Sequence, residues 1–545
     1  MHDVNGQIKI NYVDILQQKI SFAEVIWQNG IITAINILGL EDPSYAYLTP
    51  GFIDAHVHIE SSMLTPVEFS RLASRHGTVA SVSDPHEIAN VLGLDGIHFM
   101  VDNAKLTPFK IFFGAPSCVP ATPFETAGAA LPATSLASLF KSGEVCYLSE
   151  MMNYPGVLNN DPETIAKLQL AQAYGCPIDG HAPGLMGEQV LQYAQAGIST
   201  DHECSTLAEA EQKLAAGMQI LIREGSAARN FEALHSLISS YPEQVMLCSD
   251  DKHPDDLVLG HINQLAARAV ALGHDVFAVL RCACLNPIVH YDLAVGQLRV
   301  GDVMDAVALS DLKNLQAVKT WINGQLVAES GVSLIASVPV EAINQFQARK
   351  VTVDDFKIPA SSKVRVIKAF DGELLTEEWQ TTPKIEQGYI VPDTPRDILL
   401  LTVINRYQAA APSIALIHGF GLQQGALVST VAHDSHNIIA VGADIDALCL
   451  AVNEIIAQQG GIAVCHQGQV QVLPLPIAGL MSDRDGDYVA GRYAQLDQQA
   501  KQLGSTLRAP FMSLSFMALL VIPELKLSDQ GLFDGRSFQF TPLQA

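Results

Sequence analysis

The sequence predicts an α/β fold: a (β/α)8 barrel, a small β-sandwich domain formed by the segments on either side of that barrel, and a C-terminal α+β domain. Short apolar segments alternate with helix-like segments over about 240 residues, a length typical of such a barrel. Asn-Gly bends between strand-like runs occur both before and after it, at residues 29–30 and 323–324. A further set of strands with one well-delimited helix follows from residue 363.

The composition is that of a globular protein with a large core and an excess of negative charge. Of the 545 residues, 48% are hydrophobic and 16% are charged. A formal net charge of −25 repels phosphates and anionic membrane surfaces, so we expect a small-molecule substrate and no nucleic-acid or membrane partner. We also expect a homo-oligomer. The nine cysteines have no paired spacing, and we find no signal peptide, which predicts reduced thiols and a cytoplasmic location.

The small β domain is predicted from two separate segments. Strands are expected at 8–10, 24–27 and 31–35, with a hairpin bend at Asn29-Gly30, a strong short-range hairpin signal. Residues 301–309 and 317–328 return to strand patterning after the barrel, and these apolar strands need partners. We therefore join residues 1–47 and 301–341 into one domain.

The barrel is predicted at residues 48–300. Helix-like segments between its strands are long enough to cross back over a parallel sheet, for example 65–76, 161–174, 188–196 and 207–217. Eight segments have the pattern of its strands: 52–58, 78–84, 110–115, 145–150, 177–181, 197–202, 218–224 and 245–250.

The C-terminal domain is predicted at residues 363–545, after a polar connector at 342–362. Its strands include 397–404 and 413–417. A helix is expected at 445–459, because Asp444 suits its N-cap and Gly460 its C-terminal stop.

Six potential metal ligands lie at the ends of predicted barrel strands. His56 and His58 are two residues apart on the first strand and so point to the same side. Any one of the others alone would more often be a hydrogen-bonding residue of the core. All strands of a barrel end at one rim, however, where four imidazoles and two carboxylates suit two divalent cations, Mn²⁺ above all, with Fe²⁺ or Zn²⁺ as alternatives. The six are His56, His58, Glu150, His181, His202 and Asp250.

This ligand set predicts hydrolytic chemistry. Divalent cations lower the pKa of bound water and make a hydroxide available at neutral pH. A neighbouring carboxylate can take the proton of that water, and Asp250 is the candidate for this role. Asp251 follows it on the same loop and is a candidate substrate contact.

Longer motifs resemble the adenine deaminase family of the amidohydrolase superfamily. Residues 50–62 (PGFIDAHVHIESS) resemble the first-strand motif of the superfamily, with an extension specific to this family. The resemblance spans nearly the whole chain. Further matching motifs are residues 82–93 (VSDPHEIANVLG), 116–122 (PSCVPAT), 179–184 (DGHAPG), 201–204 (DHEC), 223–226 (REGS), 431–437 (VAHDSHN) and 475–480 (LPIAGL).

The resemblance implies hydrolysis of adenine to hypoxanthine and ammonia by a metal-activated hydroxide, in purine salvage. It implies that Glu150 replaces a carboxylated lysine that bridges the metals in other members. It also places Asp84 and Glu87 in the active site as catalytic residues, one of which protonates the purine ring, and His86 between them is a candidate substrate contact.

Two alternatives remain at this point. Metal ligands alone do not name the substrate, so another hydrolase of this superfamily, acting on a cyclic amide or an acetylamino sugar, would share them. A metal-binding protein without catalysis is the other alternative. His433 and His436 lack a further ligand nearby in sequence, so we expect them to be structural or to line the mouth of the active site.

Overall fold

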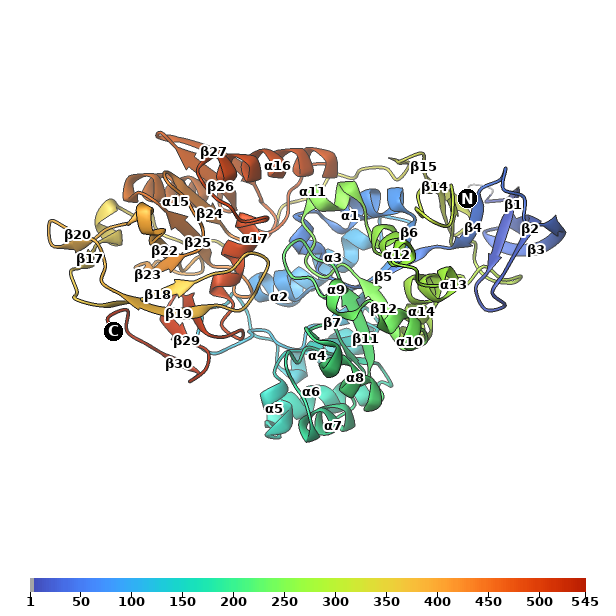
Figure 1. The fold of residues 1–545 in the computed structure, drawn as a ribbon, viewed down its shortest axis with the longest axis horizontal. Helices are drawn as coiled ribbons and strands as arrows, with labels where there is room; N and C mark the ends of the chain where they lie inside the picture. Colours follow the sequence, from blue (N-terminus) through green and yellow to red (C-terminus); the bar gives the residue numbers. More distant parts are fainter. Residues whose placement is uncertain (1–3) are drawn as a thin grey trace.

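A computed structural model describes residues 4–545 of the chain, and three parts follow one another along its longest axis (Figure 1). The strands nearest the N-terminus form a sheet at one end. Parallel strands with surrounding helices occupy the middle, and the C-terminal region forms the other end.

The first sheet has eight strands from both predicted segments, in the order β16-β15-β14-β13-β4-β1-β2-β3. Its bends are the Asn-Gly pairs, since Asn29 and Asn323 have a φ of 51° and favour this left-handed turn geometry. Of the strand predicted at 301–309, residues 306–309 form β13, whereas residues 301–302 form a turn and Val303 makes a single antiparallel bridge with Ile31. The strands are β1 (Gly6–Asp14), β2 (Lys19–Gln28), β3 (Ile31–Leu40), β4 (Tyr47–Pro50), β13 (Ala306–Leu309), β14 (Ala317–Ile322), β15 (Gln325–Glu329) and β16 (Val332–Ser333).

This sheet curls so that strands distant in its order face each other. Trp27 on β2 and Trp321 on β14 have ring centroids 6.1 Å apart in an edge-to-face arrangement. The indole of Trp27 also donates a hydrogen bond to the carbonyl of Gly324, 3.1 Å away. The small apolar core enclosed in this way contains Ile10, Val25, Leu48 and Met304.

The middle of the molecule is a curled parallel sheet. Five strands run in the order β5-β6-β7-β8-β9, three more in the order β10-β11-β12, and a parallel bridge joins Val57 to Asp250. Every residue of β5 and β6 is buried, as expected for parallel strands covered on both faces. The strands are β5 (Phe52–Val57), β6 (Thr78–Ser83), β7 (Lys110–Ala115), β8 (Tyr147–Met151), β9 (Ile178–Gly180), β10 (Thr200–Asp201), β11 (Gln219–Arg223) and β12 (Val245–Cys248).

Helices alternate with these strands close to the predicted positions. Asp161 and Thr206 cap two of them, each accepting a hydrogen bond from the backbone three residues on. The principal helices are α1 (Pro66–Ala73), α2 (His86–Leu92), α3 (Leu94–Ala104), α4 (Ala133–Ser142), α6 (Pro162–Ala173), α7 (Glu188–Gln195), α8 (Leu207–Ala215), α11 (Pro254–Leu259), α12 (Ile262–Ala271) and α14 (Asn286–Tyr291).

The C-terminal region contains a second eight-stranded sheet, in the order β19-β18-β23-β22-β25-β24-β26-β27. Helix α15 (Ile445–Gln458) packs on it. Asp444 accepts a 2.6 Å hydrogen bond from Ala447 N at its start, and Gln459 (φ 56°), one residue before the predicted Gly460, ends it. The strands are β18 (Val364–Lys368), β19 (Glu377–Thr381), β22 (Leu399–Ile404), β23 (Ser413–His418), β24 (Ala426–Ser429), β25 (Ile438–Gly442), β26 (Gly461–His466) and β27 (Gln469–Pro474).

The last part of the chain connects this region to the middle of the molecule. Helix α16 (Gly486–Gln502) lies against α11, and Asp487 accepts two hydrogen bonds from Arg75, of 2.7 and 2.6 Å. Helix α17 (Pro510–Ser515) and the hairpin of β28 (Leu525–Ser528) and β29 (Gly531–Asp534) follow. Asp529 bonds to Thr126 of the middle part, so the two regions share polar as well as apolar contacts.

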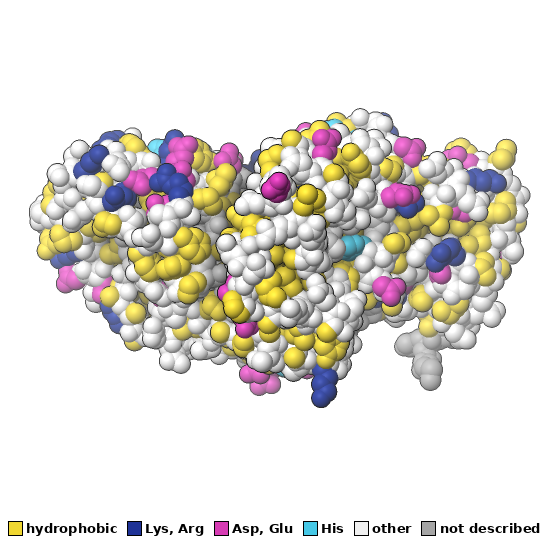
Figure 2. Space-filling view, turned by 90° about the horizontal axis from the view of Figure 1, so that it is seen from below, with side chains coloured by type: hydrophobic (Ala, Val, Ile, Leu, Met, Phe, Trp, Pro, Cys, Tyr) yellow, Lys and Arg dark blue, Asp and Glu magenta, His cyan; other side chains and the backbone are white. Residues whose placement is uncertain are grey.

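No helix within residues 4–545 is both long and apolar enough to cross a membrane. On the face seen in Figure 2, acidic and basic side chains lie scattered among hydrophobic and neutral ones.

Candidate active site

The structure brings the six predicted ligands together at the carboxyl ends of the parallel strands. Glu150 lies at their centre: its Oε1 is 3.4 Å from His58 Nε2, and its Oε2 is 2.7 Å from His181 Nδ1 and 3.0 Å from His202 Nε2. Asp250 Oδ1 is 3.3 Å from His58 Nε2. All of these side chains are buried.

The arrangement of the imidazoles fits divalent cations. His56 Nε2 and His58 Nε2 approach within 3.2 Å, and the rings of His56 and His202 stack at 4.1 Å. His58 Nδ1 lies 3.1 Å from the backbone oxygen of Asp84, which must accept its proton, so the lone pair of Nε2 points into the cluster. Burial, with His202 and His58 alongside, lowers the pKa of His56 well below its usual value. Burial also opposes a charge on His58, His181 and His202, but neighbouring carboxylates outweigh it and raise the pKa of each. Imidazole nitrogens therefore converge with carboxylates, the donor set that a metal site requires.

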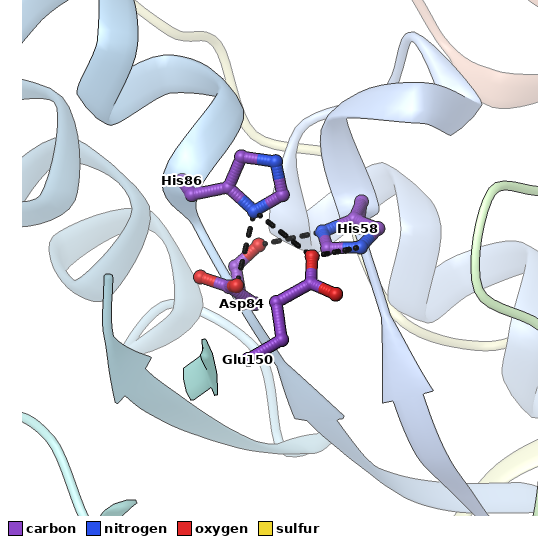
Figure 3. Close-up of side chains that lie close together, drawn as sticks. All are labelled: His58, Asp84, His86 and Glu150. Atoms are coloured by element: carbon purple, nitrogen blue, oxygen red, sulfur yellow. Dashed lines mark hydrogen bonds and ion pairs between the residues drawn. The ribbon is translucent and has the colours of Figure 1, made fainter. Parts of the chain in front are cut away.

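Asp84 and His86 lie beside this cluster (Figure 3). His86 Nδ1 is 3.0 Å from Asp84 Oδ2 and 3.5 Å from Glu150 Oε1. Asp84 directly follows β6, and His86 opens α2, so both come from the same rim as the ligands. His86 lines the pocket, and Asp84 lies behind it and reaches the pocket through its ring.

Two charged residues at this rim were not predicted. Arg223, at the end of β11, places Nη1 2.6 Å from Asp250 Oδ2 and Nη2 3.0 Å from Glu203 Oε2. Burial disfavours the charge on Asp250, but Arg223 and the neighbouring histidines outweigh it and hold the pKa of that carboxyl well below its usual value. The seventh strand was predicted to end at Glu224, one residue beyond the end of β11, so the strand-end rule did not select Arg223.

The backbone of Asp250 is itself unusual. Its φ of 53° lies in the left-handed region, which is uncommon for a residue other than glycine. Hydrogen bonds fix this conformation, since Asp250 N donates to His56 O at 2.9 Å. Such backbone conformations are concentrated at functional sites.

Buried ion pairs beneath the site hold the strand ends in place. Asp54 Oδ1 accepts from Ser249 N at 2.9 Å, and its Oδ2 lies 2.8 Å from His261 Nε2, which ties β5 to the segment after β12. Lys213 on α8 is fully buried and donates to Ala182 O, next to His181, at 2.7 Å. Lys213 also lies 3.0 Å from Asp201 Oδ2, next to His202.

The C-terminal region closes the pocket above the cluster. Besides the predicted His86, Glu87 and Asp251, the lining includes Glu203, Arg223, Leu374, His433, Asp434, Phe516 and Leu519. The rings of His433 and Phe516 stack with centroids 5.0 Å apart. From the sequence, His433 and His436 were expected either to be structural or to line the mouth of the active site. His433 lines the pocket, whereas His436 is fully buried behind it.

Asp251 faces the same pocket from the loop after β12. Its Oδ1 accepts a 2.5 Å hydrogen bond from Ser61 Oγ, which belongs to the family-specific extension of the first-strand motif. The pocket as a whole is lined by imidazoles and carboxylates, with Arg223 as the only Arg or Lys among the described residues that line it and with Met152, Leu374, Phe516 and Leu519 among its apolar lining.

Comparison with known proteins identifies two family matches. The amidohydrolase family profile matches residues 47–327, and the profile of the adenine deaminase C-terminal domain matches residues 373–539. An adenine deaminase from Sulfurovum sp. (strain NBC37-1) is 52% identical over 535 residues, covering 98% of this chain and 99% of its own. One from Salinibacter ruber is 52% identical over 531 residues, covering 97% of each chain.

Proposed function

This chain belongs to the amidohydrolase family and, within it, groups with the adenine deaminases, and we propose that it converts adenine and water to hypoxanthine and ammonia. The observation that carries the proposal is the identity to relatives of that name along both chains, together with the convergent ligand cluster. Nothing in the site favours a cyclic amide or an acetylamino sugar.

We further propose that the site holds two divalent cations, of which Mn²⁺ is the first candidate and Fe²⁺ or Zn²⁺ are alternatives. His56, His58 and Asp250 would hold one, His181 and His202 the other, with Glu150 between them. The geometry that supports this is the central position of Glu150, whose two oxygens face different imidazoles. When bound, the cations lower the pKa of water and polarise the reacting carbon.

The residues of the chain then divide the proton transfers. Asp250 accepts the proton of the attacking water and later delivers that proton to the departing ammonia. Arg223 keeps the Asp250 carboxyl ionised before the first of these two transfers. Glu87 or Asp84 donates a proton to the ring nitrogen as water adds to C6, and it recovers a proton from the C6 hydroxyl as ammonia leaves. His86 and Asp251 position the purine through hydrogen bonds.

We also propose a domain division. Residues 1–47 with 301–341 form the small β domain, 48–300 the barrel, and 363–545 the C-terminal domain. The bridge between Val57 and Asp250 supports closure of the eight parallel strands into a (β/α)8 barrel. Nine free thiols fit the reducing cytoplasm. The homo-oligomer stays a prediction.

The test is a substrate panel with the purified protein and added Mn²⁺. Loss of adenine absorbance should match ammonia release one to one. Dihydroorotate, hydantoin and acetylglucosamine phosphate should give no product. Turnover of one of those compounds without turnover of adenine would refute the proposed substrate.

A further inference from the structure

Two histidines of the C-terminal domain enclose Glu87 of α2. His433 Nδ1 lies 2.7 Å from Glu87 Oε1, and His436 Nε2 contacts Glu87 Oε2. All three residues are buried, with at most 3% of the surface of each exposed. Since the histidines lie between β24 and β25, they approach Glu87 from a different part of the chain than every proposed ligand.

A buried glutamate with two imidazoles is also a possible cation site, but the proton positions argue against it. Ala432 N donates to His436 Nδ1 at 3.3 Å, so that nitrogen carries a lone pair and the ring proton sits on Nε2. A cation bound at Nε2 would need a lone pair on Nε2 as well. A neutral imidazole has an available lone pair on only one of its two ring nitrogens. His436 therefore presents a ring N–H to the Glu87 carboxylate, and the two groups are in close polar contact without the geometry of a regular hydrogen bond.

The charges around Glu87 agree with this assignment. Burial alone would raise the pKa of Glu87, but His433 and His436 outweigh it and hold that pKa well below its usual value. Burial lowers the pKa of His433, but Glu87 and Asp251 more than compensate and raise it to about 9. Asp434 and His86 also face this group, at 3.9 Å from His433 and 3.8 Å from Glu87.

We propose that His433 and His436 are positioning residues that hold Glu87 as a carboxylate directed into the pocket, where it accepts a hydrogen bond from an N–H group of the purine. The inference rests on the proposed function for its substrate. It makes the C-terminal domain a working part of the site, and it removes Glu87 from the two candidate acids for the ring nitrogen. Asp84 then acts on that nitrogen only by way of the His86 ring, whose Nδ1 lies 3.0 Å from Asp84 Oδ2.

The kinetic test compares pairs of variants. His433→Ala and His436→Ala remove the donor, whereas His433→Asn retains an amide donor near the position of Nδ1, and His436→Gln retains one near that of Nε2. We expect the alanine variants to lose about 10- to 100-fold in kcat/KM for adenine, the cost of one hydrogen bond to a charged group. The conservative variants should recover most of that loss. His466→Ala, in the same domain and outside the pocket, should match the parent.

Three results would overturn the inference. Loss of one metal equivalent per chain in His436→Ala would show a cation site instead. Alanine variants within about twofold of the parent would show that the contacts do not matter. Equal losses in the alanine and conservative variants, with lower thermal stability in both, would show a role in packing only.

A measurement that needs no turnover separates this inference from the proposed substrate. In zinc-loaded protein with nitrogen-15-labelled histidine, His433 should remain protonated at neutral pH, and Glu87→Gln should return its titration toward the ordinary pKa of about 6.5. A neutral His433 in the parent refutes the inference even if adenine is turned over. A protonated His433 supports it even if adenine is not the substrate.

Discussion

Replacing Asp250 by Asn separates its proposed proton transfer from its structural contacts. The amide keeps the shape of the side chain, and Arg223 keeps its two contacts with Glu203. The backbone bond from Asp250 N to His56 O is unaffected. The variant should therefore fold, and it should retain part of its metal through the four histidines and Glu150.

The expected loss of activity is that of a general base. Such a residue contributes about 10²- to 10⁴-fold, or about 2.7–5.5 kcal/mol of transition-state stabilisation. We expect kcat for adenine to fall by that factor at saturating Mn²⁺, measured as ammonia release. Glu243→Gln, on an exposed carboxylate, is the matched control. Turnover of Asp250→Asn within about tenfold of the control would refute the assignment of the base.

Three further predictions follow from the site. Chelation should abolish activity, and Mn²⁺ should restore it; activity that survives complete metal removal would contradict the ligand assignment. Lys213→Met leaves Asp201 and Glu209 buried without their cation, so we expect a loss of about 3–5 kcal/mol, seen as a Tm lower by roughly 10 °C, and an unchanged Tm would contradict this. Phe516→Ala removes the ring that stacks on His433, and KM for adenine should rise by up to about tenfold while metal content stays constant.

The strand ends show what the sequence could predict. The alternation of apolar runs located all eight parallel strands, and one geometric rule, that parallel strands end at one rim, brought residues as distant as His56 and Asp250 together. The strands are shorter than predicted at several ends: β10, for example, spans only Thr200–Asp201 of the predicted 197–202, because its pairing with β11 begins at Thr200.

Contacts between distant parts of the chain could not be predicted in this way. Arg223 pairs with Asp250 and Glu203 through side chains whose reach depends on the packing of three strands. His433 meets Glu87 only because the C-terminal domain folds back over the rim, and no periodicity within either segment indicates that. Residues 301–305 were predicted as part of a strand, but only Val303 pairs there, in a single bridge with Ile31 at the start of β3, while Met304 packs in the small core of the first sheet.

The most direct test of the central claim is a crystal structure of the Mn²⁺-loaded protein with anomalous diffraction data. The account predicts two peaks about 3.5–4 Å apart, both within bonding distance of Glu150, one beside His56 and His58 and the other beside His181 and His202. A single peak, or peaks at other side chains, would contradict it.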